Sequence, residues 1–305
     1  MNRAHFILAG LFTAACASTE PALLGVADRA AVDIGDLSQG GQNVMSITTP
    51  IGYRQGDKSL AYEGPGWESD RVAYRLYLDG RNAVDIFGKR QPSLILHYVG
   101  RGDDYHAMAE WGMDILKVGN SLGAGGFGVM RGAEAVQIGD AARYRAEVVT
   151  DTNDRATLRV THVGSESCGN DIQADYTIEA GSRLTDVRVR GDCALPLAAG
   201  IVVHPETLKD VVSTSGPWSA IFRYGEQSLV PDNLGIVIFY KSAEVSRVSD
   251  DSDDSYIAFK AKVSPHYKFA AVWSQEPGAP QDADAFAGWV QTTLDHLNNQ
   301  DDHDR

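Results

Sequence analysis

An alternation of apolar and polar residues with a period of two runs through most of this chain. In the clearest example, Val72, Tyr74, Leu76 and Leu78 point to one face of a predicted strand. The same alternation recurs around residues 144–149, 156–163, 171–178, 184–190, 234–241, 256–263 and 266–273. Because Gly, Asn, Asp and Pro turns separate these segments, the pattern predicts an all-β fold, an antiparallel β-sandwich.

Helical spacing is scarce in this sequence. Asp282 is placed to cap a C-terminal helix with one apolar stripe, formed by Phe286, Trp289, Val290, Thr293 and Leu297, which we expect to pack on the sandwich. A second short helix is predicted over 105–116, from the spacing of Met108, Trp111 and Ile115. With no composition break and no repeat, we expect one β-sandwich domain over 32–300 and a disordered acidic tail over 301–305.

The first eighteen residues read as an export signal. A weakly positive start precedes the apolar run 6–15, which is too short to span a membrane. Cleavage after Ala17 fits the small residues there, whereas the sequence 13–16 resembles a lipobox that would leave a lipid on Cys16. We therefore expect the periplasm or an outer-membrane lipoprotein, with membrane contact only through that possible lipid anchor.

Two cysteines remain after the export segment. The chain from Cys168 to Cys193 reads as a hairpin that turns at Gly181, which puts the two thiols almost opposite each other. In an oxidising compartment such a pair is expected to form a disulfide. The alternative is two free buried thiols.

The charge balance argues against a nucleic-acid partner. The chain has 27 Lys+Arg and 41 Asp+Glu, a formal net charge of −14, whereas binding to phosphate backbones needs a basic face. One stretch, residues 71–101, is locally basic, with six Lys or Arg and two acidic residues. An anionic ligand would have to be held there.

Motifs for nucleotide, serine-hydrolase and metal chemistry are missing from the sequence. The Gly-rich run 119–128 has no P-loop pattern and no βαβ context, so its glycines are interpreted as turns or close backbone approaches. No G-x-S-x-G motif and no zinc-type Cys/His spacing occurs, and the acidic run 250–254 lacks EF-hand spacing and reads as a loop. We expect no cofactor and no metal.

The second face of the 72–79 strand carries the chemistry of interest. Arg75, Tyr77 and Asp79 lie in line there, offering a cation, a phenol ring and a carboxylate. Such a row suits a sugar acid, since Arg pairs with a carboxylate through two hydrogen bonds and an aromatic ring covers a pyranose face. An exposed sheet face with an ordinary cross-strand ion pair is the alternative.

Four histidines lie in segments that look ordered: His97, His106, His204 and His266. His106 follows a polar loop and Tyr105, and His204 ends an apolar strand, so both are candidates for proton transfer near neutral pH. For each of them the alternative is a hydrogen-bonded structural histidine.

These segments resemble the bacterial family catalogued as domain of unknown function 4861. The motifs that carry the resemblance are YEGPGWESD at 62–70, YRLYLD at 74–79 with RN at 81–82, DIFGK at 85–89, YH at 105–106, WGMDILKVG at 111–119 and SPHYKFAAVW at 264–273. The resemblance covers most of the chain after the export segment. It implies an exported protein of carbohydrate-degradation gene clusters, a supersandwich similar to mutarotase and polysaccharide-lyase domains, and uronate-containing substrates of the ulvan or pectin type. It carries over no catalytic residue.

The leading hypothesis is an exported carbohydrate-active enzyme, a dehydratase or lyase, that acts on a uronate-bearing oligosaccharide by elimination. Such a reaction needs a cation for the carboxylate, a base and an acid. Arg75 with Arg81 would hold the carboxylate, His106 or His204 would be the base, and Tyr105 or Tyr77 the acid. The residues expected to position the sugar are Trp67, Glu68, Asn82, Lys117 and His266.

Two other functions stay open at this point. A glycoside hydrolase or sugar epimerase on the same substrates would depend on acids such as Glu68 and Asp70, or Glu206. A non-catalytic sugar-binding module would bind without turnover.

Overall fold

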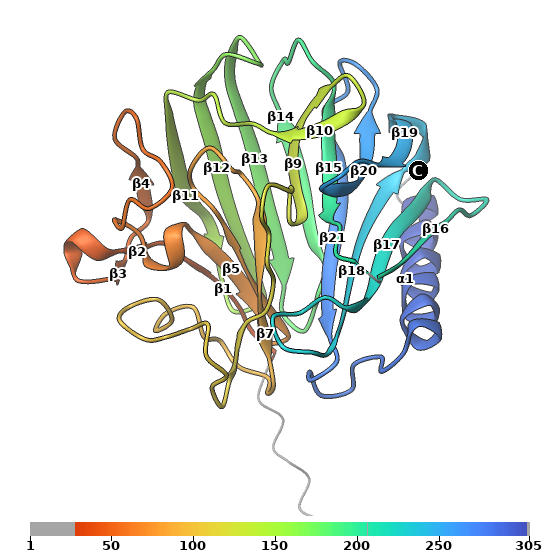
Figure 1. The fold of residues 1–305 in the computed structure, drawn as a ribbon, viewed down its shortest axis with the longest axis horizontal. Helices are drawn as coiled ribbons and strands as arrows, with labels where there is room; N and C mark the ends of the chain where they lie inside the picture. Colours follow the sequence, from red (N-terminus) through yellow and green to blue (C-terminus); the bar gives the residue numbers. More distant parts are fainter. Residues whose placement is uncertain (1–27, 206, 304–305) are drawn as a thin grey trace, which may run out of the picture.

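Three large antiparallel sheets and one two-stranded sheet make up the structure, a computed structural model that describes residues 28–205 and 207–303, without the side chains of 301–303. The large sheet has nine strands in the order β16-β17-β18-β21-β14-β13-β12-β11-β4. Two sheets of five strands, which we call the site sheet (β1-β5-β6-β7-β8) and the small sheet (β10-β9-β15-β20-β19), accompany it (Figure 1). The predicted all-β antiparallel sandwich is confirmed. The export segment 1–18, with Cys16, and Glu206 lie outside the described residues.

Most strand bounds follow the predicted alternation, but β6 ends at Leu76 rather than at residue 79, and β20 ends at Phe259 rather than at residue 263. The large sheet comprises β4 (Ser46–Thr48), β11 (Arg143–Asp151), β12 (Arg155–Ser165), β13 (Asn170–Glu179), β14 (Thr185–Arg190), β16 (Leu208–Val212), β17 (Trp218–Glu226), β18 (Asn233–Lys241) and β21 (His266–Trp273). The site sheet comprises β1 (Ala30–Asp33), β5 (Gly66–Ser69), β6 (Val72–Leu76), β7 (Val84–Lys89) and β8 (Gly112–Asp114). The small sheet comprises β9 (Ala124–Arg131), β10 (Glu134–Gln137), β15 (Leu197–Val202), β19 (Val245–Asp250) and β20 (Asp254–Phe259), and a short pair is formed by β2 (Gly35–Asp36) and β3 (Gln42–Asn43). The acidic run turns from β19 into β20, as predicted.

The main core lies between the site sheet and the inner face of the large sheet. Trp67 on β5 stacks on Tyr176 of β13, with ring centroids 4.7 Å apart, and Tyr74 meets Phe269 edge to face at 5.0 Å. These rings are buried, and burial of such large apolar surfaces supplies most of the stabilisation of a sandwich. The packing fixes how β6 and β7 sit, and hence where their polar faces point.

A disulfide joins Cys168 and Cys193, so that prediction is confirmed. It closes the β13–β14 hairpin, whose turn contains Gly181 at φ +72. By restricting the unfolded chain, a bridge over a loop of this length stabilises a fold by about 3 kcal/mol.

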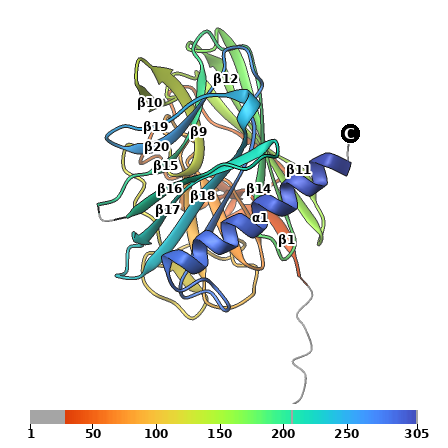
Figure 2. The same cartoon turned by 90° about the vertical axis from the view of Figure 1, so that its right-hand side faces the viewer.

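Helix α1 (Ala283–His303) lies on the outer face of β17 and β18 (Figure 2). Asp282 caps it, its Oδ1 accepting a hydrogen bond of 2.8 Å from the Ala285 N–H. Its buried side chains are Phe286, Val290, Leu294 and Leu297. The helix extends to His303, so three residues of the predicted disordered tail are helical. Among the described residues, no helix is both long and apolar enough to cross a bilayer.

The second predicted helix, over 105–116, is wrong. The chain there makes turns and then enters β8, where Gly112 at φ +134 pairs with Lys89 of β7. Trp111 packs against Phe87, with centroids 6.2 Å apart, and Met108 is exposed. The apolar spacing that suggested a helix therefore arises from one core contact, one exposed side chain and one strand-end residue, Ile115.

Glycines in the run 119–128 do allow unusual backbone, as the sequence suggested. Gly119, Gly123 and Gly125 have φ values of +60, +76 and +97. A Cβ on Gly123 would collide with the Val84 carbonyl oxygen, so only glycine lets β9 begin this close to β7. The run connects the site sheet to the small sheet.

Candidate functional site

Charged side chains from β6, β7 and β8 meet on one face of the site sheet. Arg75 of β6 lies opposite Asp85 of β7 in the strand register, and Asp114 ends β8 on the other side of β7. All three are almost fully buried. Successive side chains of a strand point to opposite faces of the sheet. The sequence neighbours of these charged residues therefore point into the core, and the charged side chains gather on the opposite face of the site sheet.

The Arg75 guanidinium is the centre of this cluster. Its Nη2 lies 2.6 Å from Asp85 Oδ2 and 2.7 Å from Asp114 Oδ2, and its Nε donates to Asp85 at 3.1 Å. Its Nη1 donates to the Tyr62 carbonyl and to the Tyr105 hydroxyl at 3.2 and 3.3 Å. A guanidinium has five N–H donors, and these contacts occupy each nitrogen.

Two acidic side chains share this one cation, so the buried cluster would carry surplus negative charge if both were ionised. Burial raises the pKa of Asp114, and the charge of Asp85 raises it further, to about 8, although Arg75 opposes both effects. Burial lowers the pKa of Arg75, but the two carboxylates outweigh it, so the guanidinium stays charged. Asp114 is therefore a carboxyl that exchanges its proton near neutral pH.

The cluster opens on a shallow pocket of about 290 Å³. Its lining includes Arg75, Tyr77, Arg81, His106, Asp114 and Lys117. The His106 Nε2 lies 3.4 Å from Asp114 Oδ2, and the imidazole is 57% exposed. The Tyr105 ring lies beside it, with centroids 4.4 Å apart. A buried proton is thus connected to solvent through one exposed imidazole.

Two cations stand at the mouth of this pocket. Lys117 is exposed and makes no ion pair with any residue that the structure describes. Arg81 binds Asp79, Nη2 to Oδ2 at 2.6 Å, and lies over the Tyr77 ring at 3.5 Å. An anionic group entering the pocket would meet Lys117 as a free charge partner.

The structure brings together six of the site residues expected from the sequence, and leaves five elsewhere. Those in or against the pocket are Arg75, Tyr77, Arg81, Tyr105, His106 and Lys117. Those elsewhere are Trp67, Glu68, Asn82, His204 and His266.

Three of the displaced residues are structural. Trp67 is fully buried and donates its Nε1–H to Thr185 Oγ1 at 2.9 Å, so a sugar cannot reach it. The Glu68 carboxylate is buried against Lys89. Asn82, at φ +46, bonds the Phe127 carbonyl and His162 from within the core. None of them is kept as a sugar-binding residue.

The two displaced histidines do not line the pocket. His204 rests against the backbone of Lys117 without lining the pocket, and burial lowers its pKa. His266 sits on the outer face of the large sheet, 2.8 Å from Asp186. We therefore set His204 aside as the base and His266 as a sugar contact of this pocket.

The expected roles of Arg75 and Tyr77 also change. Every nitrogen of Arg75 already has a protein partner, so it holds Asp85 and Asp114 in place rather than a substrate carboxylate. Tyr77 donates to Asp85 at 2.6 Å, and burial raises its pKa further above the usual range, so its phenol is fixed as a donor to that carboxylate. Both are positioning residues.

Asp85 and Asp114 were missed as site residues, although a signal existed. Each is an isolated acid within an otherwise apolar run, VDIF and MDIL. A carboxylate in such a run must either be paired or titrate abnormally once the strand is buried. That rule points to both residues without reference to structure.

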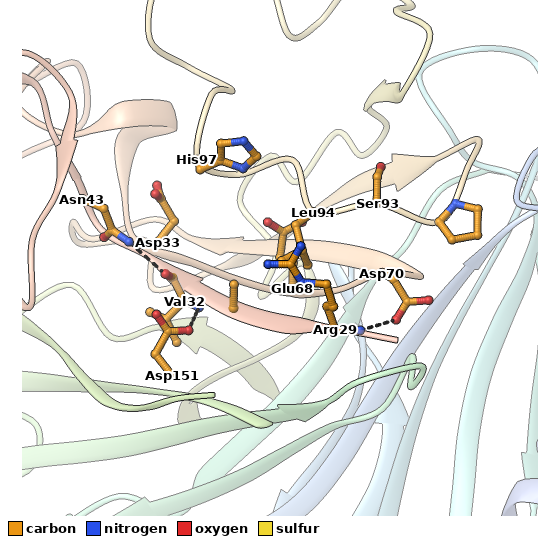
Figure 3. Close-up of a pocket in the computed structure, with 12 residues that line it drawn as sticks. Arg29, Val32, Asp33, Asn43, Glu68, Asp70, Ser93, Leu94, His97 and Asp151 are labelled. Atoms are coloured by element: carbon orange, nitrogen blue, oxygen red, sulfur yellow. Dashed lines mark hydrogen bonds between the residues drawn. The ribbon is translucent and has the colours of Figure 1, made fainter. Parts of the chain in front are cut away.

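A larger hollow, of about 530 Å³, lies between β1 and the loop that carries Ser93, Leu94 and His97 (Figure 3). Its acids already have partners in the protein: Asp151 accepts from the Val32 N–H at 3.1 Å, Glu68 from the Leu96 N–H at 2.9 Å, and Asp33 from Arg101 at 2.8 Å. These side chains hold segments together, so the smaller pocket is the better site for chemistry. Among the described residues, no three His, Cys, Asp or Glu side chains gather as they would to hold a metal ion.

Comparison with known proteins gives one finding. The family model described as "Domain of unknown function (DUF4861)" matches residues 25–300. No curated protein matches the chain significantly. Because the match spans most of the sequence, from before β1 into helix α1, this protein belongs to the family DUF4861.

Proposed function

We propose that the protein is an exported carbohydrate-active enzyme that acts on uronate-containing oligosaccharides, of the ulvan or pectin type, by elimination, as an oligosaccharide dehydratase or lyase. The observation that carries the proposal is the pairing of Asp114, a buried carboxyl with its pKa raised to about 8, with the exposed imidazole of His106 at 3.4 Å. Such a pair can take up a proton at neutral pH. The free charge of Lys117 beside it suits an anionic substrate.

Elimination from a uronate breaks the C5–H bond next to the carboxylate and the C4–O bond, and forms a C4=C5 double bond. His106 takes the C5 proton at Nδ1 while its Nε2 proton passes to Asp114, whose raised pKa makes it a good acceptor. Tyr105 gives its phenolic proton to the leaving oxygen, and burial, by raising the pKa of Tyr105, keeps that proton available. The products are an unsaturated uronate and water or an alcohol.

The cations of the pocket have different tasks in this scheme. Lys117 and Arg81 hold the substrate carboxylate and stabilise the charge that develops as the C5 proton leaves. Arg75 keeps Asp114 in register with His106 and takes no direct part. The steps use side chains of the chain alone.

The test is incubation with a panel of saturated and unsaturated uronide oligosaccharides, followed by mass spectrometry. A lyase splits a chain without adding water, a dehydratase yields a product one water lighter, and a hydrolase adds one water. Unchanged masses over the whole panel, together with calorimetric binding, would show a sugar-binding module instead. An epimerase would leave masses unchanged and alter the anomeric or ring proton signals in NMR.

His106→Ala should lower turnover by about 100-fold or more, with substrate binding largely kept. His97→Ala is the matched control, because His97 is also exposed but lines the larger hollow. Equal losses in the two variants would remove the basis for placing the reaction at this pocket.

A further inference from the structure

A second polar hollow lies on the other side of the large sheet from the proposed active site. It measures about 760 Å³ and is lined by β12, β13, β14, β21 and the C-terminal half of α1. Its lining includes Arg155, Thr157, Thr177, Arg188, Lys268 and His296. We call it the helix groove. Helix α1 packs mainly on β17 and β18, and its C-terminal half runs on diagonally toward β11 (Figure 2), so that it forms one wall of the groove.

One carboxylate of this region, that of Asp186, is shared among several basic side chains. Asp186 is bonded by Lys268, by His266 at 2.8 Å and by Arg188 at 3.2 Å. Arg155 pairs with Glu179 at 2.9 Å, and both side chains are more than half exposed. The groove is lined by three cations, Arg155, Arg188 and Lys268, and by two carboxylates, Glu179 and Asp186. It therefore carries a surplus positive charge, whereas the chain as a whole has a formal charge of −14. This is the opposite of the Arg75 cluster, where two carboxylates share one cation.

The geometry of the groove suits an extended polar chain. Its charged residues occupy four neighbouring strands of one sheet, from Arg155 on β12 to Lys268 on β21. Three inter-strand spacings give a span of about 14 Å. Between the charges lie the hydroxyls of Thr157 and Thr177, 3.0 Å apart, which can exchange hydrogen bonds with sugar hydroxyls. Arg155 and Arg188 are exposed enough to give their remaining N–H donors to carboxylates.

We propose that the helix groove binds a segment of a carboxylate-bearing glycan, as a docking site separate from the pocket at Asp114. The choice of a uronate chain as occupant rests on the proposed function, whereas the preference for an anion rests on the charges of the groove. Because the large sheet lies between the two sites, one chain cannot fill both with the same sugar residues. The groove holds polymer near the enzyme, which counters the repulsion between a polyanion and an acidic protein.

The experiment measures binding of an oligogalacturonate of about ten residues by titration calorimetry, in a His106→Ala background so that turnover does not interfere. Arg155→Ala/Arg188→Ala should weaken binding at least tenfold, and added NaCl should weaken binding of the parent protein. Arg145→Ala is the matched control, since Arg145 forms a similar exposed ion pair with Glu147 on β11 but does not line the groove. It should bind as the parent does.

Equal affinity of the double variant and its parent, at unchanged melting temperature, overturns the proposal. So does equal binding of neutral dextran, or binding of a sulfated galactan when oligogalacturonate does not bind. Turnover of a uronide disaccharide, too short to reach the groove, should be the same for the wild type and for Arg155→Ala/Arg188→Ala. Absence of all turnover would contradict the proposed function alone, because the groove is judged by binding.

Discussion

Two basic residues are buried on neighbouring strands of the site sheet, Arg75 on β6 and Lys89 on β7, and their surroundings differ. Lys89 faces one carboxylate, Glu68, and donates also to the Ser69 and Ser93 carbonyls, both at 2.6 Å. Arg75 faces two carboxylates, Asp85 and Asp114. Both cations are almost inaccessible to solvent.

The comparison separates an ion pair that only stabilises the fold from one that is placed to take part in proton transfer. Around Lys89 the charges balance one to one. The Glu68 carboxylate also accepts hydrogen bonds from the Ile95 and Leu96 N–H groups, so the pair holds the loop that contains these two residues against β5. Around Arg75 there is a surplus carboxylate, and it touches the exposed His106. A buried charge alone does not mark a reactive site; imbalance together with an opening to solvent does.

Replacing Lys89 should have the largest effect on stability. Lys89→Met leaves the Glu68 carboxylate buried without its cation, which should cost about 3–5 kcal/mol of unfolding free energy, measured by urea denaturation. Lys89→Met/Glu68→Gln should recover a large part of that loss. If the double variant is no more stable than the single one, the loss does not come from an unpaired Glu68 carboxylate.

Asp114→Asn should lower turnover while the protein still folds. The amide keeps the shape but cannot accept a proton from His106, so turnover of uronides should fall by about 100-fold, equivalent to about 2.7 kcal/mol. In the wild type, turnover should rise with pH as Asp114 loses its proton near pH 8. The variant should lose that rise; a pH profile that keeps its wild-type shape would exclude Asp114 as the titrating group.

The same variant tests the charge imbalance through stability. A carboxyl with a folded-state pKa of about 8 and an unfolded value near 3.9 stabilises the fold at low pH, and this contribution is lost as the pH rises through the folded value. Between pH 6 and 9, unfolding free energies from urea denaturation should therefore shift in favour of Asp114→Asn by roughly 2 kcal/mol relative to wild type. If the unfolding free energies of wild type and Asp114→Asn change with pH in the same way, Asp114 does not have the raised pKa on which this prediction rests.

Lys117→Met should have the smallest of these effects. Because Lys117 is exposed and unpaired among the described residues, its loss should leave stability unchanged and raise the KM for a uronide about tenfold, equivalent to about 1.4 kcal/mol. Lys260→Met, which removes an exposed lysine directly after β20, is the control. Comparable KM values for these two variants would argue that Lys117 does not meet the substrate carboxylate.

Much of the fold could be predicted because each strand shows its own alternation. The hairpin with its disulfide and the capped helix α1 depend on neighbouring residues, so local patterns were enough to place them. The site was harder to predict. Trp67 lies in a Gly- and Pro-rich segment that looks like an exposed loop, yet the large sheet covers it completely.

Asp114 shows where sequence reasoning stops. Burial raises its pKa, and so does the charge of Asp85, which is distant in the chain and comes close only because β7 and β8 pair. The expectation of a helix over 105–116 hid that pairing. His106 and Tyr105 could be suspected from their chemistry, but their meeting with Asp114 requires the tertiary structure.

The position of β21 in the large sheet determines when that sheet can close during synthesis. β21 is the last strand to be synthesised, yet it lies between β18 and β14 and joins two halves of the sheet that otherwise do not touch as neighbours. Until residue 273 has emerged, each half presents an open edge with unpaired backbone groups. The sheet therefore closes only after nearly the whole chain exists, which makes folding slow and leaves chains shortened before β21 prone to aggregation.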